Sequence, residues 1–158
     1  MTKMNDDGGL IGMRTEDLRV QALKNPLGIN ENPVFSWQLV SDKKDEKNER
    51  QTAYRILVSE SEASLINETG MLWDSGVVKE SRCFGILYQG KKLHSAQKAY
   101  WKVMVWDGEN QASVWSETAS FETGLLERED WKGTWIGQGE DYENQELAPV
   151  LVGEFEVA

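Results

Sequence analysis

The stretch Gln51–Val58, QTAYRILV, carries large apolar side chains at every second position. Tyr54, Ile56 and Val58 fall on one face of an extended chain, because successive side chains of a strand point to opposite faces. Arg55 falls on the other face. A strand that lines a hydrophobic core on one side has this period of two, so the stretch predicts a core strand.

A second run, residues 100–106 (YWKVMVW), shows the same period more strongly. Its expected faces hold Trp101, Val103 and Val105 on one side, and Tyr100, Lys102, Met104 and Trp106 on the other. The next four residues are Asp107-Gly108-Glu109-Asn110. They predict a hairpin turn, because Asp-Gly tolerates the positive φ that such turns require.

Short apolar runs between turn residues complete the prediction of an all-β sandwich with seven strands, ending near Gly124. The expected strands are Leu18–Leu23, Val34–Val40, Thr52–Ser59, Leu72–Ser75, Phe84–Tyr88, Tyr100–Trp106 and Trp115–Thr123. One short helix is expected after the third strand. Ser59 and Glu62 have the spacing of a capping box, in which each side chain satisfies a backbone N–H at the helix start.

The chain has 158 residues and a formal net charge of -10 at pH 7. This charge opposes binding to polyanions, so neither nucleic acid nor a membrane is expected as a partner. Cys83 is the only cysteine, so no disulfide within the chain is possible, and Cys83 is expected to pack as a small apolar residue. Residues 1–12 lack the apolar run of a signal peptide, which leads us to expect a cytoplasmic protein.

Candidates for catalysis are few. Glycosidases use two carboxylates about 5 to 10 Å apart, and Asp74 and Asp107 are the acidic residues that lie among aromatic ones. We expect instead that each accepts hydrogen bonds from a turn. His94 is the only histidine and is expected on an exposed loop, which disfavours a catalytic triad or a metal site. No glycine pattern precedes a helix, and no cofactor is expected.

The seven tryptophans are many for this length. Trp37 and Trp101 alternate with polar neighbours and are expected in the core. The candidates for contact with a sugar or with an adjoining domain are Trp106, Trp115, Trp131 and Trp135. Exposed aromatic rings stack on the apolar faces of pyranose sugars, but we favour contact between domains, because an interface leaves an exposed apolar patch when its partner is absent.

Composition divides the chain into four segments. We expect a flexible N-terminus at 1–14, the sandwich at 15–124, an inter-domain linker at 125–138 and the start of a following β-sandwich module at 139–158. Pro149–Val157 predicts a single strand, which cannot satisfy its own backbone groups and needs partners from a longer chain.

Seven short motifs follow one another in a fixed order. They are NPLGI at 25–29, FSWQL at 35–39, QTAYRILV at 51–58, LWDSG at 72–76, YWKV at 100–103, WSE at 115–117 and DWKG at 130–133. From about Leu18 to Gly137, this series resembles the N-terminal, fibronectin-type-III-like region of bacterial α-L-rhamnosidases of glycoside hydrolase family 78. The resemblance implies a fibronectin type III or immunoglobulin-like sandwich.

The same resemblance implies a function. In that family, the sandwich precedes further β-sandwich modules and an (α/α)₆ barrel that carries the acidic catalytic residues. No position here matches the motifs of that barrel. The chain is therefore expected to be a non-catalytic accessory domain of an enzyme that hydrolyses terminal α-L-rhamnosyl residues with inversion. Its expected partners are the remaining domains of the parent enzyme and rhamnose-containing glycans. The alternatives are a carbohydrate-binding module in its own right and a fibronectin-type domain for protein interaction.

One position departs from the fibronectin pattern. Such domains often carry a tyrosine at the start of the sixth strand, on the core side, whose hydroxyl ties down the preceding loop. Here Ala99 occupies that side and Tyr100 points the other way, so this hydrogen bond is not expected.

Overall fold

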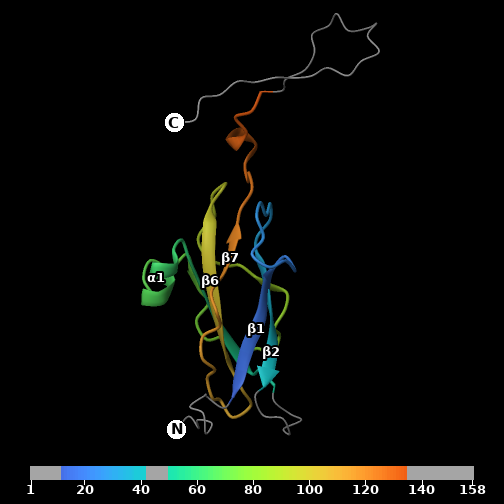
Figure 1. Ribbon diagram of the computed structural model, residues 1–158, viewed down its shortest axis with the longest axis vertical. Coiled ribbons are helices and arrows are strands. Elements are labelled where there is room, and N and C mark those ends of the chain that lie inside the picture. The colour runs from blue at the N-terminus through green and yellow to red at the C-terminus, as the bar shows by residue number, and fades with distance from the viewer. Residues whose placement is uncertain (1–11, 42–49, 135–158) are drawn as a thin grey trace, which may run out of the picture.

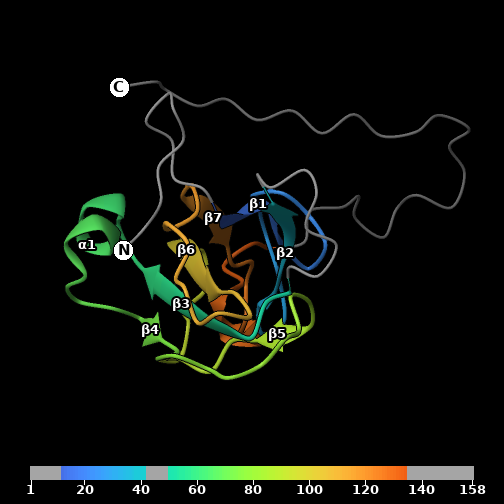
Figure 2. The same cartoon turned by 90° about the horizontal axis from the view of Figure 1, so that it is seen from below.

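The computed structural model describes residues 12–41 and 50–134, in which two antiparallel sheets pack face to face (Figures 1 and 2). The elements are β1 Met13–Val20, β2 Val34–Ser41, β3 Ala53–Ser59, α1 Glu62–Asn67, β4 Trp73–Asp74, β5 Ile86–Leu87, β6 Lys98–Trp106, β7 Ala119–Glu122 and the 3₁₀ helix η1 Arg128–Asp130. The predicted seven-stranded, fibronectin type III or immunoglobulin-like sandwich is confirmed. The predicted segment 139–158, with its strand at Pro149–Val157, lies outside the described residues.

The strands divide into a three-stranded sheet, β1-β2-β5, and a four-stranded sheet, β4-β3-β6-β7. β3 and β6 pair from end to end, with Ile56 opposite Val103 and Val58 opposite Trp101. Figure 2, which looks along the sandwich, shows the two layers with α1 outside them. α1 packs against β3 and β6, and its Leu65 is fully buried there.

The core lies between the sheets and is built largely from rings. The inner faces of β3 and β6 are buried, as their period of two predicted. Phe35 on β2 and Trp101 on β6 join the sheets with ring centroids 4.6 Å apart. Trp73, Tyr88 and Phe121 surround Phe35 at centroid distances between 5.8 and 6.5 Å. Aromatic rings bury large apolar areas, so this cluster dominates the energetics of the fold.

Gln51, at the start of the motif QTAYRILV, is a fully buried polar side chain. Its Oε1 accepts a hydrogen bond from Trp37 Nε1 at 3.0 Å. Its Nε2 donates to the carbonyl oxygens of Arg82 at 2.7 Å and Glu80 at 3.2 Å. Buried polar groups need such partners, and Gln51 thereby ties β2 to the segment that leads to β5.

β1 differs from its prediction. It starts before the predicted strand Leu18–Leu23 and ends at Val20, so that prediction was wrong. Gln21 and Ala22 have φ angles of 51° and 62° and form a tight turn. The turn is closed by two reciprocal backbone hydrogen bonds of 2.9 Å between Val20 and Leu23. Residues other than glycine rarely adopt positive φ, which is why an apolar run misled the prediction.

The start of α1 also differs. The predicted capping box of Ser59 and Glu62 is wrong, because Ser59 is the last residue of β3 and stays in its ladder with β6. Ser61 is the N-cap instead, and its side chain accepts a hydrogen bond from Ser64 N–H at 3.1 Å. The backbone pairing of β3 therefore delays the helix by two residues.

Three serines extend the four-stranded sheet through the same pair of hydrogen bonds. Each donates its backbone N–H to the carbonyl of a core-strand residue and accepts that residue's N–H with its own hydroxyl. The pairs are Ser75 with Ile56, Ser113 with Val105 and Ser116 with Val103, with N···Oγ distances of 2.8, 3.1 and 3.0 Å. Because the hydroxyls of Ser113 and Ser116 take the place of backbone carbonyls as acceptors for β6, the regular ladder is broken there, and β7 starts only at Ala119 and not at the predicted Trp115.

Tyr88 holds the loop at Lys91 with its hydroxyl, from a position that the fibronectin pattern does not predict. Ala99 fills the usual tyrosine site and is fully buried. The Tyr88 hydroxyl instead donates to the Lys91 carbonyl at 2.9 Å, and burial raises its pKa to about 12. Gly90 makes this possible, since a Cβ there would lie 2.5 Å from both the Tyr88 hydroxyl and the Leu72 carbonyl oxygen.

Candidate functional site

Trp115 forms the centre of a cluster on the outer face of the four-stranded sheet. Lys102 Nζ lies 4.6 Å from the Trp115 ring centroid, and Arg55 Cζ lies 5.7 Å from it. Lys102 lies on β6 and Arg55 on β3, and both point to the outer face of the sheet. Their chain neighbours Trp101 and Tyr54 point to the buried face. The ring therefore lies across the sheet, and its cation–π contacts each contribute about 0.5–2 kcal/mol.

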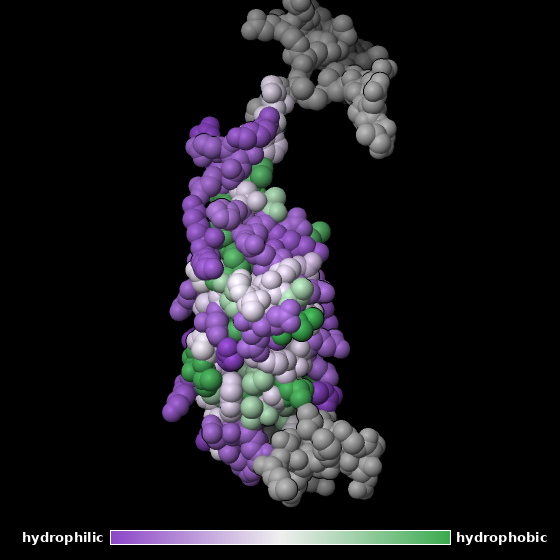
Figure 3. All heavy atoms as spheres, turned by 90° about the vertical axis from the view of Figure 1, so that its left-hand side faces the viewer, coloured by the Kyte–Doolittle hydropathy of each residue, from purple (hydrophilic) through white to green (hydrophobic). Residues whose placement is uncertain are grey.

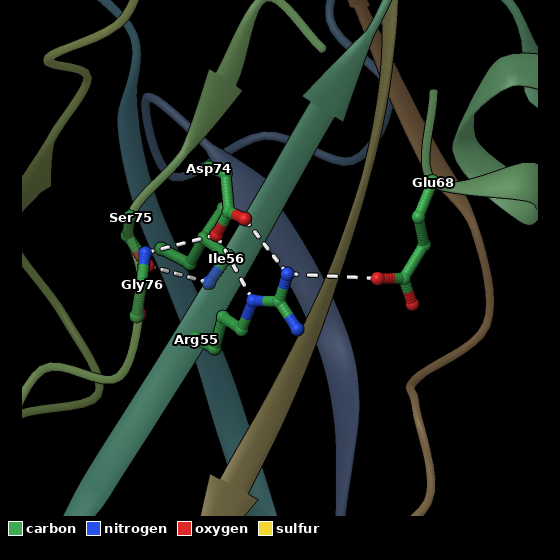
Figure 4. Close-up of polar contacts among 6 residues, drawn as sticks. All are labelled: Arg55, Ile56, Glu68, Asp74, Ser75 and Gly76. Atoms are coloured by element: carbon green, nitrogen blue, oxygen red, sulfur yellow. Dashed lines mark hydrogen bonds and ion pairs between the residues drawn. The ribbon is translucent and has the colours of Figure 1, made fainter. Parts of the chain in front are cut away.

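Arg55 connects this cluster to Asp74 (Figure 4). Arg55 Nε and Nη2 donate to the two carboxylate oxygens of Asp74 at 2.9 and 2.7 Å, and Glu68 lies 3.5 Å from Nη2. Hydrogen bonding from Arg55, helped by the Gly76 N–H, holds the pKa of Asp74 below its usual value. A general acid must stay protonated near its working pH, so Asp74 is unsuited to that role. The expected turn hydrogen bond of Asp74 is confirmed by Gly76.

Lys102 is the residue of this cluster that sequence reasoning missed. It was expected only on the outer face, yet it is 8% exposed. Burial lowers the pKa of its ammonium group, which lies over the Trp115 ring. Its stem covers apolar surface while the charge contacts the ring, a packing that long side chains allow. Lys102 and Trp115 are 13 positions apart, so no local sequence pattern indicates their contact.

Of the four predicted tryptophans, the three that the structure describes do not form one site. Trp106 is partly buried at the end of β6, where its carbonyl accepts a hydrogen bond from Thr52 N–H at 2.8 Å. Trp131 follows β7, which pairs with the opposite end of β6, and it is 57% exposed. Its ring lies against Gly133. Trp135 lies outside the described residues. Among the three described, Trp115 is held by charges and Trp131 is the exposed one.

A groove of about 490 Å³ runs between β1 and residues 114–119. One acidic residue of its lining, Asp17, accepts hydrogen bonds from Arg19 at 2.8 Å and Gln38 at 3.1 Å, and pairs with Lys24 at 2.8 Å. Hydrogen bonds from Arg19 and Lys24 lower the pKa of Asp17. Asn25 Oδ1 accepts from Ser120 N–H at 2.8 Å. The side chains of Asp17 and Asn25 are thus bonded to the domain itself.

The remaining candidates occupy structural positions. Asp107 Oδ1 accepts the N–H groups of Glu109 and Gln111 at 2.9 and 2.8 Å, which confirms the predicted turn. His94 is exposed and Cys83 packs against the core, both as expected.

Within residues 12–41 and 50–134, no three His, Cys, Asp or Glu side chains are grouped so that they could hold a metal ion. No helix in this part of the chain is long and apolar enough to cross a membrane.

Comparison with known families matches residues 15–127 to the family described as Rha78A-like, N-terminal immunoglobulin domain. The chain belongs to this family. It is 43% identical over 114 residues to an α-L-rhamnosidase of Alteromonas sp. (strain LOR), and the match covers 72% of this chain and 12% of that protein. An α-L-rhamnosidase of Formosa agariphila is 42% identical over 118 residues, with 74% and 12% covered. The chain thus spans about an eighth of these relatives.

Solved structures agree with this assignment. The domain superposes on the α-L-rhamnosidase from Dictyoglumus thermophilum with a TM-score of 0.74 and 42% identity, covering 80% of this chain and 14% of that one. The Streptomyces avermitilis α-L-rhamnosidase, complexed with L-rhamnose, also gives a TM-score of 0.74, with 32% identity and 80% and 12% covered.

Proposed function

We propose that this immunoglobulin domain is a non-catalytic accessory domain at the N-terminal side of an α-L-rhamnosidase-like glycosidase. The parent enzyme would hydrolyse terminal α-L-rhamnosyl residues, with inversion at the anomeric carbon. Residues 125–138 would link the sandwich to a following β-sandwich module that starts at about residue 139.

One observation carries the proposal. Relatives named α-L-rhamnosidase share about 40% identity with this chain, and it covers only 12 to 14% of their length. Two carboxylates, those of Asp74 and Asp107, support the non-catalytic part. Asp74 is bound by Arg55 and Asp107 by turn N–H groups, so both have structural partners in place of a reacting sugar.

The test is hydrolysis of an aryl α-L-rhamnoside. The 158-residue chain is expected to release no phenol above background, and the protein extended through the residues that follow Ala158 in its reading frame is expected to cleave the substrate. Release of β-L-rhamnose, followed by NMR at early times, would support inversion. Hydrolysis by the 158-residue chain, or an inactive extended protein, would contradict the proposal.

A carbohydrate-binding role is the second candidate, and the exposure of Trp131 favours it. An exposed indole can stack on the apolar face of a pyranose. Titration with L-rhamnose, followed by the indole N–H signals in NMR, tests this role. Shifts of the Trp131 signal would support it, and unchanged signals at high sugar concentration would exclude it.

A further inference from the structure

One end of the sandwich brings together three segments that are far apart in sequence. After β7, the chain runs beside residues 26–29. There Ile29 N–H donates to the Glu122 carbonyl at 3.0 Å, and Gly124 N–H donates to the Ile29 carbonyl at 2.8 Å. From the other side, Ala96 N–H donates to the Gly124 carbonyl at 3.0 Å. Figure 1 shows this end at the top, where the orange segment after β7 leaves the sandwich.

Ser95 fixes that segment to the domain. Its hydroxyl accepts a hydrogen bond from Leu126 N–H at 2.7 Å and donates one to the carboxylate of Asp130. Lys92 adds an ion pair with Glu127 at 2.8 Å, whose exposure makes it a weak contributor. The direction in which the chain leaves the sandwich is therefore set within the described residues.

Large apolar side chains remain exposed at this same end. Leu27 is 77% exposed, Leu125 46% and Trp131 57%. Leu27 and Leu125 flank a close backbone contact, since a Cβ on Gly124 would lie 3.1 Å from the Gly28 carbonyl oxygen. Figure 3 shows hydrophobic residues, in green, among hydrophilic ones towards this end. We name Leu27, Leu125 and Trp131 the exit face.

We propose that the exit face is the docking surface for the module that follows in the same polypeptide, and that Ser95 sets the angle at which the chain departs. The inference rests on the proposed function, because it takes the domain as one part of a longer enzyme. Position argues for this occupant, since the chain leaves the sandwich at this face (Figure 1).

The length of the relatives and the charged neighbours of the exit face also favour the following module as the partner. This chain covers only 12 to 14% of the relatives that it matches, so most of each relative lies outside the matched domain. The apolar residues also have charged neighbours along the chain, as the centre and rim of an interface do. These neighbours are Glu127, Arg128, Glu129 and Lys132.

Hydrogen exchange tests the docking directly. The 158-residue chain is compared with the protein extended past Ala158 in its reading frame. The amides of Ile29, Gly124 and Leu126 are expected to exchange about tenfold more slowly in the extended protein, because docking suppresses local opening. The amide of Leu65, at the buried side of α1, is expected to exchange equally in both.

Matched variants separate docking from a general change in stability. In the extended protein, Leu27→Asp combined with Leu125→Asp is expected to restore the faster exchange. Ile66→Asp, at a position on α1 that is 71% exposed, is expected to leave the slow exchange intact. All three positions are exposed, so both variants should fold, which circular dichroism verifies.

Three results would overturn the proposal: equal exchange in the two proteins, protection that survives the double variant, or self-association of the 158-residue chain with the same protection. The last would make a second copy the occupant. Failure of the proposed function is distinguishable, because an extended protein that cleaves the rhamnoside with an unprotected exit face contradicts only the docking.

Discussion

The space between the sheets and the exit face both gather large apolar side chains, but only the first encloses them. Trp101 is fully buried against Phe35, whereas Trp131 is 57% exposed. Neighbouring rings and the two sheets surround Trp101. The sandwich therefore completes its core without the apolar groups of the exit face, which stay in contact with solvent.

Of the substitutions considered, Trp101→Ala is expected to lower the free energy of unfolding most. Loss of a fully buried tryptophan leaves a cavity and is expected to lower the free energy of unfolding by about 3–5 kcal/mol. Trp131→Ala in the same 158-residue chain is expected to change it by less than about 0.5 kcal/mol. Urea denaturation followed by far-UV circular dichroism measures both, and similar losses for the two variants would contradict the contrast.

Gln51→Leu tests the polar part of the core. It leaves Trp37 Nε1 and the Glu80 and Arg82 carbonyls without this partner, at an expected cost of about 1–3 kcal/mol. Gln111→Leu, at an exposed position, serves as the matched control and should cost far less. If both variants unfolded at the same urea concentration, Gln51 would not be the tie that its contacts indicate.

Tyr88→Phe removes the hydroxyl that holds the Lys91 carbonyl, with an expected loss of about 0.5–1.5 kcal/mol at neutral pH. The pKa of Tyr88 is raised from 10.0 to about 12 by burial. The folded state therefore holds the proton more tightly, and this contribution to stability is complete below pH 10 and lost as the pH rises towards 12.

The measurement is the difference in unfolding free energy between the wild type and Tyr88→Phe as a function of pH. It should narrow between about pH 10 and 12, because only the wild type loses stability from this group. A difference that stays constant across this range would show that Tyr88 titrates normally in the folded protein.

Ser95→Ala is expected to lower the global free energy of unfolding only slightly, by about 1 kcal/mol or less, because it affects hydrogen bonds at one end of the domain. Its local effect should be larger. Leu126 N–H loses its acceptor, so its hydrogen exchange should accelerate. Trypsin should also cleave after Arg128 more rapidly. Ser81→Ala, at an exposed position, is the control, and equal cleavage of both variants would mean that Ser95 does not hold the segment.

Period-two patterns predicted β3 and β6 well, because their alternation is strict and one face of each is buried. The motifs of the chain also made the family recognisable. The errors arose where a backbone or side chain departed from the regular pattern. The turn at Gln21 and Ala22 uses positive φ without glycine, and the serines at 113 and 116 replace part of the ladder with β6.

The candidate site was less predictable than the fold. Trp115 and Arg55 could be named from the sequence, yet their contact joins two elements 60 positions apart. The roles of Lys102 and Ser95 likewise depend on partners brought near by folding. A local pattern records which face a side chain occupies, and it carries no information on what covers that face.

The most direct test of the contrast between core and exit face is Trp131→Ala measured in two proteins. In the 158-residue chain, its effect on the free energy of unfolding is expected to be below about 0.5 kcal/mol. In the protein extended past Ala158, unfolding of this domain should become easier by about 2 kcal/mol, as for a tryptophan at the centre of an interface. An equally small effect in both proteins would contradict the account.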